Sequence, residues 1–373
     1  MDIFFLICCF FVVYPYAVYP VVVRLLAFFV RKRWSTGSIT PAVSVIISAY
    51  NEESIIVEKV RNTLECDYPP ECLEVIVVSD GSTDGTVDAM VQIHDPQVVL
   101  KAYENRAGKT ACLNRMVPAA RGEILLFTDA NSMFPRDLLK KTARNFHDES
   151  IGLVTGWTQY RSPDGREEAT GAYSRLEKIT KRWESLISSC VGADGAVFAM
   201  RKSLYSPMGP DEINDFVLPL RVIAQGKRVV LDPEVYCMEK SAGNEGKEFR
   251  RQARITNRTI RALAAHIHLL NPLRFGSFSF LLLSHKLLRF LAPFWVMGAL
   301  LSSLVLASQS WYYKILLIGE ISVLTLTIRA LFHRTENRLI QMARTFLITL
   351  AAQSLGWWRF LRGRTDTMWT PQR

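Results

Sequence analysis

The sequence predicts an α/β domain built on a mainly parallel sheet and flanked at both ends by transmembrane helices. From Pro41 to about Gly243, short buried apolar runs alternate with amphipathic stretches, which is the pattern of parallel α/β domains. Long apolar runs precede and follow this region, and 49% of the chain is hydrophobic. We therefore expect four segments. They are a helix with its basic flank at 1–34, the α/β domain at 40–245, amphipathic interface helices at 246–285, and membrane helices with a basic tail at 286–373.

The first apolar run extends from Ile3 to Val30 and ends on the basic cluster Arg31-Lys32-Arg33. It is too long for the apolar core of a signal peptide, and its positive flank is on the C-terminal side. We interpret it as a spanning helix that is kinked at Pro15 and Pro20. The positive-inside rule then places the α/β domain in the cytoplasm.

Three further runs, Leu287–Leu306, Ile315–Leu331 and Phe346–Trp358, are candidate spans. Three crossings would leave the C-terminal arginines outside, against the charge rule. Either the last run is re-entrant or interfacial, or Phe275–Leu291 crosses together with its neighbour. We favour a cytoplasmic C-terminus and a multi-pass protein of the cell (inner or plasma) membrane.

The net charge of +10 suits nucleic acid, or anionic lipid and phosphorylated substrates. Predicted membrane helices favour the lipid and phosphate interpretation, so we expect no nucleic acid. The seven cysteines show no metal-ligand spacing, so neither disulfides nor a zinc site are indicated.

Polar turns follow each predicted strand of the α/β domain. Val43–Ile47 leads into Tyr50-Asn-Glu52, with a helix expected to begin within Asn51–Ser54. Leu73–Val78 leads into an acidic, glycine-rich turn at Asp80, and Gln97–Ala102 leads into Gly108-Lys109-Thr110. The last turn lacks the first glycine of a P-loop, which argues against an ATPase. A lysine at a helix N-terminus still suits phosphate.

A fourth buried strand, Ile124–Phe127, ends in Asp129 and Asn131. The carboxyl ends of parallel strands form the ligand-binding edge of open α/β sheets. Side chains two residues apart in an extended segment point the same way, so both oxygens could meet one hard cation. An Asx turn that merely closes the strand is the alternative.

These turns carry a resemblance. Ser-Ala-Tyr-Asn-Glu at 48–52, Ser-Asp-Gly-Ser-Thr-Asp-Gly-Thr at 79–86, Gly-Lys-x-x-x-Leu-Asn at 108–114 and Phe-Thr-Asp-Ala-Asn at 127–131 resemble the motifs of family 2 glycosyltransferases of GT-A (Rossmann-like) fold. With flanking membrane helices, the chain is similar to bacterial polysaccharide synthases such as the cellulose, chitin and hyaluronan synthases. The resemblance implies a nucleoside diphosphate sugar donor, Mg²⁺ or Mn²⁺, and inversion at the anomeric carbon.

Carried over by position, Tyr50, Glu52 and Asp80 would grip the uridine of a UDP-sugar, and Lys109 would lie near the nucleotide. Asp129 would hold the metal. Asn131 stands where the family has a second aspartate, so we expect a weakened cation site.

The second half would supply the catalytic base and the acceptor site. Asp215 matches the family's catalytic base, with Asn214 replacing the preceding acid. Asp211 and Glu212 are the fallback candidates. The segment 192–198, with Asp194 and Gly195, resembles the glycine-rich segment beneath the acceptor sugar, although Asp194 could equally belong to a turn. Trp183 is either an acceptor platform or a core residue.

Arg251-Gln252-Ala253-Arg254 occupies the position of the Gln-x-x-Arg-Trp motif of processive synthases, with Ile255 in place of tryptophan. By this match Arg251, Gln252 and Arg254 would bind the diphosphate. A basic amphipathic helix on anionic headgroups is the alternative. The missing tryptophan puts acceptor stacking, and with it processivity, in question.

The function we expect is extension of an extracellular or capsular polysaccharide from a UDP-sugar by a membrane-embedded inverting glycosyltransferase, coupled to export. One alternative is transfer of a single sugar to a polyprenyl-phosphate-linked acceptor. The other is a catalytically inactive scaffold subunit that binds nucleotide or polymer. The acceptor is thus a glycan or a lipid-linked molecule, and the need for a second copy or an export partner is left open.

Overall fold

The computed structural model describes residues 1–161, 172–240, 245–332 and 337–365, so the end of the predicted basic tail (366–373) lies outside the described residues. The chain forms two compact units. The sheet unit comprises Val23–Gly243 and His266–Leu281, and the helical unit comprises Met1–Val22, Asn244–Ala265 and Leu282–Thr365. The boundaries of the four segments expected from the sequence stay predictions.

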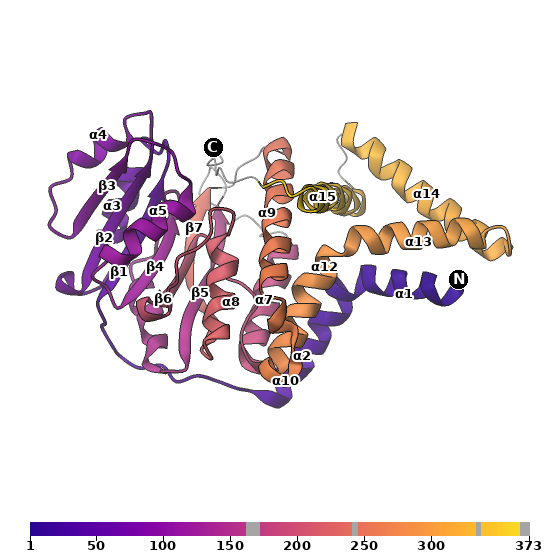
Figure 1. The fold of residues 1–373 in the computed structure, drawn as a ribbon, viewed down its shortest axis with the longest axis horizontal. Coiled ribbons are helices and arrows are strands. Elements are labelled where there is room, and N and C mark those ends of the chain that lie inside the picture. Colours follow the sequence, from indigo (N-terminus) through magenta and orange to yellow (C-terminus); the bar gives the residue numbers. More distant parts are fainter. Residues whose placement is uncertain (162–171, 241–244, 333–336, 366–373) are drawn as a thin grey trace. The chain divides into compact units, whose positions relative to one another are not determined.

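A single seven-stranded sheet forms the centre of the sheet unit (Figure 1), in the order β3-β2-β1-β4-β6-β5-β7. Neighbouring strands are parallel from β3 to β4, and β5 is parallel to β7. Strand β6 runs antiparallel to both of its neighbours, so the sheet is mixed. The strands are β1 (Val43–Ala49), β2 (Leu73–Asp80), β3 (Val98–Tyr103), β4 (Ile124–Asp129), β5 (Ile151–Arg161), β6 (Val197–Arg201) and β7 (Arg228–Lys240).

The apolar runs become strands because they are covered on both faces. Every residue of β1 and β2 is buried, as expected for central parallel strands. Register pairs Ser48 of β1 with Asp129 of β4, and Ala49 with Ser79 of β2. These strands therefore end at one edge of the sheet, and their polar turns gather there.

Helices connect these strands. They are α3 (Ile56–Leu64), α4 (Thr86–Val91), α5 (Lys109–Met116), α6 (Leu138–Ala143), α7 (Ala172–Ile187) and α8 (Asn214–Ala224), followed by α10 (Pro272–Phe275) and α11 (Ser277–Leu282). Helix α3 begins at Ile56, so the expected start within Asn51–Ser54 was wrong. The reason is local, because Asn51 has a φ of +55°, which no right-handed helix accommodates.

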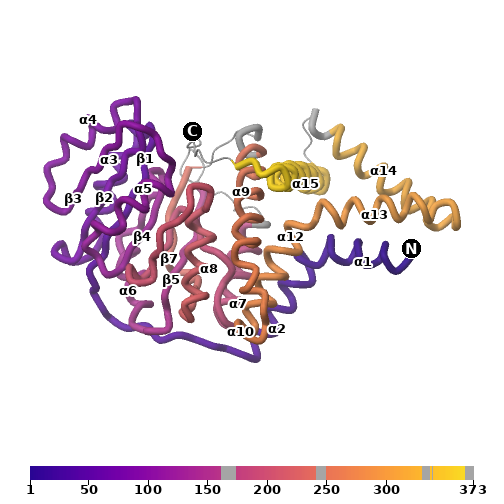
Figure 2. Tube along the Cα trace, viewed as in Figure 1, coloured from indigo at the N-terminus to yellow at the C-terminus, as the bar shows by residue number. Residues whose placement is uncertain are grey.

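The helical unit joins both ends of the chain. Helices α1 (Asp2–Val13) and α13 (Ala292–Leu306) lie side by side (Figures 1 and 2). The rings of Phe11 and Trp295 stack there with centroids 4.8 Å apart. Helix α9 packs against α15, where the Asn257 amide donates to the Gly356 carbonyl (3.2 Å). The remaining helices of this unit are α9 (Glu245–Ala265), α12 (Leu288–Phe290), α14 (Trp311–Phe332) and α15 (Arg338–Leu361). Helix α2 (Tyr19–Val30) continues α1, and the boundary between the two units falls within it, after Val22.

Two helical stretches, Asp2–Val30 and Trp311–Arg329, are long and apolar enough to cross a membrane. The first contains a π-helical turn at Tyr14–Val18 that includes Pro15, one of the two prolines at which a kink was expected. The bent pair Ser277–Phe290 and Ala292–Leu306, with 60° between its parts, would make a third span. Among the described residues α15, which contains Phe346–Trp358, does not reach the same apolarity.

Candidate active site

The turns after β1 and β2 are locked together by side chain to backbone hydrogen bonds. The side-chain oxygen of Asn51 accepts from the backbone amide of Thr83 (2.8 Å), and the backbone amide of Asn51 donates to the Ser82 hydroxyl (3.1 Å). This contact explains why Asn51 holds a positive φ, which asparagine tolerates better than most residues. The two motifs thus act as one rigid edge.

Tyr50 and Glu52, the predicted uridine-binding residues of the first turn, are held by this edge. Glu52 is buried, and its amide donates to the Thr86 hydroxyl (2.8 Å). The guanidinium carbon of Arg106 lies 3.7 Å from the Tyr50 ring centroid. Sequence reasoning missed Arg106, although a basic residue just before Gly108-Lys109 was a visible signal. Its Nε and Nη2 atoms are buried without a hydrogen-bond partner among the described residues.

Asp80 holds the next loop in place. Its two carboxylate oxygens accept from the amides of Ala107 (2.7 Å) and Gly108 (2.9 Å). Gly81 has a φ of +66°, and a Cβ there would come within 2.8 Å of the Arg106 nitrogen, so this close approach requires glycine. The contact between Asp80 and uridine stays a prediction.

Lys109 and Asp129 form an ion pair across the sheet edge. Lys109 Nζ lies 2.6 Å from Asp129 Oδ1, and the side chains are 14% and 26% exposed. The Thr110 hydroxyl, next along α5, donates to the Glu212 carbonyl (2.9 Å). The chain of contacts therefore links the β4 turn to the segment that precedes α8.

The residues of the β4 turn fit a divalent cation that is also bound by the phosphates of the substrate. Asp129 contributes one carboxylate and Asn131, exposed in the following turn, an amide oxygen. Among the described residues no group of three or more His, Cys, Asp or Glu side chains gathers to form a complete site. Mg²⁺ is commonly held by one or two carboxylates plus substrate phosphates, which matches this donor set.

A buried lysine lies beneath the same turn. Lys59 of α3 is fully buried, and its ammonium donates to the Ser132 carbonyl (2.5 Å) and lies 3.1 Å from the Phe134 ring centroid. The Ser132 hydroxyl in turn donates to Glu239 of β7 (2.5 Å). Burial lowers the pKa of Lys59 to about 7. The sequence analysis did not single out Lys59.

Lys59 predicts a pH dependence of stability. Between about pH 7 and about pH 10 the folded protein has released the Lys59 proton while the unfolded chain keeps it, so stability rises with pH. Lys59→Met should lose this contribution, which approaches about 1.4 kcal/mol per pH unit. Unfolding measured across this range in detergent checks it, with Arg61→Met, an exposed position on the same helix, as the control. Equal pH slopes for wild type and Lys59→Met would refute the assignment.

Asp215 lies in the first turn of α8 against the glycine-rich segment. Its carbonyl accepts from the Ala193 amide (2.7 Å), and a Cβ on Gly195 would lie 2.9 Å from its Oδ2. The preceding Asn214 is buried, and its Nδ2 has no hydrogen-bond partner among the described residues. The fallback Glu212 is engaged elsewhere, since its carboxylate pairs with Arg221 (2.7 Å) and accepts from the Gly209 amide (2.7 Å).

Gly195→Ala tests this contact. The added methyl group should displace the Asp215 carboxylate, because a 2.9 Å approach is shorter than a carbon–oxygen contact allows. We expect kcat to fall by about 100-fold or more while nucleotide affinity is unchanged, since small misplacements of catalytic groups cost this much. Gly319→Ala, whose added Cβ would meet no other atom within 4 Å, serves as the control. A Gly195→Ala enzyme with normal kcat would separate Gly195 from the chemistry.

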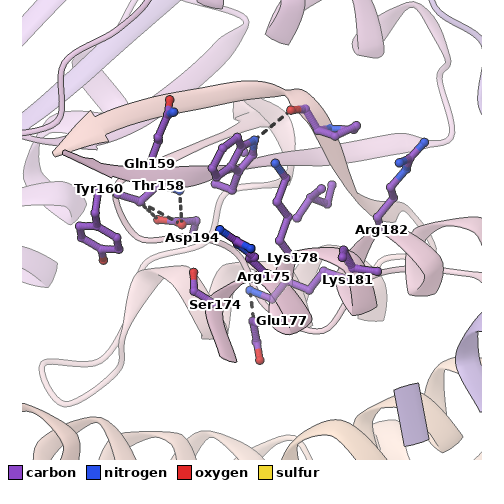
Figure 3. Close-up of a pocket in the computed structure, with 15 residues that line it drawn as sticks. Thr158, Gln159, Tyr160, Ser174, Arg175, Glu177, Lys178, Lys181, Arg182 and Asp194 are labelled. Carbon is purple, nitrogen blue, oxygen red and sulfur yellow. Dashed lines mark hydrogen bonds and ion pairs between the residues drawn. The ribbon is translucent and has the colours of Figure 1, made fainter. Parts of the chain in front are cut away.

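A cavity of about 680 Å³ lies between β5, β7 and α7, with Asp194 on its wall (Figure 3). Asp194 accepts from the Thr158 amide (3.0 Å) and hydroxyl (2.9 Å) and from the Ala196 amide (3.0 Å), so it closes a turn and also lines the cavity. The sequence had left these two interpretations open. The lining residues are Gly156, Trp157, Thr158, Gln159, Tyr160, Ser174, Arg175, Glu177, Lys178, Ile179, Lys181, Arg182, Asp194, Leu231 and Pro233.

Trp183 is not among the residues that line this cavity. It lies half-buried on α7, with the Arg24 guanidinium 5.8 Å from its ring. Trp157 lines the cavity, a residue that sequence reasoning missed because a tryptophan within an apolar strand has no distinguishing pattern. The acceptor role of Trp183 stays a prediction.

Arg251, Gln252 and Arg254 lie on α9, in the helical unit. Asp129 and Asp215 belong to the other unit. Their role in binding diphosphate stays a prediction.

Comparisons with known proteins agree with this geometry. Residues 44–206 match the family model described as Glycosyl transferase family 2. The chain is 31% identical over 118 residues to beta-monoglucosyldiacylglycerol synthase of Nostoc sp., covering 31% of this chain and 25% of that protein. It is 26% identical over 204 residues to poly-beta-1,6-N-acetyl-D-glucosamine synthase of Staphylococcus aureus, covering 52% of this chain and 49% of that protein. These matches thus span from a quarter to about half of the relatives' lengths.

A solved structure shows the fold. It is the mannosyltransferase PcManGT from Pyrobaculum calidifontis in complex with GDP-Man and Mn²⁺, with a TM-score of 0.74 and 23% identity over 96% of this chain and 99% of that one. The predicted α/β GT-A fold is therefore confirmed. The predicted membrane flanks stay predictions.

Proposed function

We propose that this chain, whose residues 44–206 match the Glycosyl transferase family 2 model, is an inverting glycosyltransferase that uses a nucleoside diphosphate sugar at a membrane. The observation that carries the proposal is the edge of the sheet where Asp129 and Lys109 pair, joined through Thr110 and Glu212 to the segment that leads to Asp215. Donor-side and acceptor-side groups thus belong to one connected framework. The apolar helices Asp2–Val30 and Trp311–Arg329 support membrane embedding.

The mechanism we propose is a single displacement. Asp215 takes the proton of an acceptor hydroxyl, whose oxygen attacks the anomeric carbon from the face opposite the leaving group. The bond from that carbon to the diphosphate breaks, and the diphosphate departs with the electron pair. Lys109 at the start of α5 stabilises the developing charge. A divalent cation, Mg²⁺ or Mn²⁺, held by Asp129 and Asn131 would supply additional charge neutralisation when bound.

The donor we propose is a UDP-sugar, on the strength of the motif resemblance. The test is release of nucleoside diphosphate from a panel of UDP- and GDP-sugars by purified, detergent-solubilised protein with Mn²⁺. Release from one UDP-sugar would support the proposal and name the sugar. Release from GDP-sugars alone would retain the enzyme class and correct the nucleotide. Nucleotide binding without any release would favour the inactive scaffold.

Two product classes follow from the relatives. A polysaccharide product is supported by likeness to the poly-N-acetylglucosamine synthase, and a glycolipid or carrier-linked product by likeness to the glucosyldiacylglycerol synthase. We propose polysaccharide extension, with export through the membrane helices. Sizing the labelled product separates the two, because a polymerase makes a ladder and a single-sugar transferase adds one sugar.

A further inference from the structure

The cavity beside Asp194 is lined by four basic residues of α7, three of which have no carboxylate partner among the described residues. No carboxylate of the described residues forms an ion pair with Arg175, Lys178 or Arg182 of α7. Lys181 differs, since its ammonium lies 3.8 Å from Glu177. Figure 3 shows these basic side chains along one wall of the cavity. The wall therefore carries a net positive charge.

Lys178 is the most informative of these cations. Its ammonium lies 3.0 Å from the centroid of the Trp157 ring, a cation–π contact. Burial, and then the charge of Arg182, lower the pKa of Lys178 to about 8, so it is mostly protonated at neutral pH. A partly desolvated ammonium without a carboxylate partner is costly, and a bound anion would offset that cost.

The two carboxylates of the cavity offset only part of the charge of its four cations. Glu177 pairs with Lys181, and the Asp194 carboxylate accepts from Thr158 and Ala196. The apolar part of the lining is formed by Trp157 and Leu231, together with Ile179, which is 42% exposed. Trp157 is fixed because its indole nitrogen donates to the Pro233 carbonyl (2.9 Å). A ligand with a negative group and an apolar chain matches both halves of this lining.

The cavity also adjoins the proposed base. Asp194 lines it, and the next residue, Gly195, meets Asp215 Oδ2. We propose that this cavity binds the phosphate or diphosphate group of a lipid carrier on which the glycan is extended, with Lys178 as its central contact and the apolar lining receiving the first part of the lipid chain. This inference rests on the proposed function, because it assigns the acceptor class of that same site.

The test measures binding in the absence of any donor. The probes are geranylgeranyl phosphate, the uncharged alcohol geranylgeraniol and inorganic phosphate, titrated calorimetrically against the full chain in detergent. We expect the prenyl phosphate to bind at least about tenfold more tightly than the alcohol, the difference that a charge-assisted hydrogen bond supplies. Lys178→Met should remove this preference and Lys178→Arg should keep it. Lys101→Met, which removes an exposed lysine of β3, should leave it unchanged.

Four results would overturn the proposal. One is equal affinity for the prenyl phosphate and the alcohol in wild type. Another is an undiminished preference in Lys178→Met. A third is equally weakened UDP binding in that variant, which would assign the cavity to the donor diphosphate. Inorganic phosphate binding as tightly as the prenyl phosphate would also overturn it, because the site would then recognise a free anion. None of these titrations needs turnover, so a protein without transferase activity would fail the proposed function and still answer this question.

Discussion

Asp215→Asn is expected to lower glycosyl transfer by about 10²- to 10⁴-fold, the usual contribution of a general base, while leaving nucleotide affinity unchanged. The amide has nearly the size of the carboxylate, so the contact with Gly195 and the backbone bond from Ala193 should persist. Only the ability to accept the proton of the acceptor hydroxyl is lost. Initial rates with the donor identified by the panel, together with calorimetric binding of UDP, check both parts.

Asp211→Asn is the matched control for this experiment. Asp211 belongs to the same acidic segment and precedes α8, so its loss alters the local charge equally. We expect that variant to retain most of its activity. If Asp211→Asn were inactive and Asp215→Asn active, the base would be Asp211 and the motif match would be wrong by a few residues.

Asp129→Asn is expected to lower activity by about 100-fold or more, because charge stabilisation by a metal is worth several kcal/mol. Asp129 is the one carboxylate of the β4 turn, and its loss would also leave Lys109 without its partner at 2.6 Å. The measurement is UDP affinity with and without Mn²⁺. We expect Mn²⁺ to strengthen UDP binding in wild type and to have little effect in Asp129→Asn.

Asn131→Asp provides the reciprocal change. It adds the carboxylate that the resemblance leads one to expect at this position, so Mn²⁺ should strengthen UDP binding at lower concentrations than in wild type. An Asp129→Asn protein whose UDP affinity still responds fully to Mn²⁺ would place the cation elsewhere. Together the two variants separate loss of the metal from loss of the local fold.

Much of the sheet could be predicted because its strands are buried on both faces. Runs such as Val43–Ile47 and Ile124–Phe127 are apolar throughout, and such runs are typical of central parallel strands. Polar residues directly after parallel strands lie at the carboxyl edge of the sheet. Asp80, Lys109 and Asp129 could therefore be expected to lie near one another. The reversed direction of β6 was not predicted, because direction depends on pairing between distant segments.

Other features depend on contacts between residues far apart in the chain. Nothing in the sequence around Lys59 distinguishes it from an exposed lysine of a helix. Its burial results from packing against Ser132 and Phe134. Trp183 was the candidate acceptor platform in the sequence, whereas Trp157 lines the cavity.

The class of fold, the order of the strand-ending motifs and the acidic residues at the sheet edge could be predicted from the amino-acid sequence, because burial periodicity and turn chemistry are local properties. Which side chains meet became known only from the folded structure. It brought Gly195 against Asp215, Lys109 to Asp129, and Lys178 onto Trp157. The physical reason is that such contacts depend on the packing of whole elements, whose relative positions no local pattern encodes.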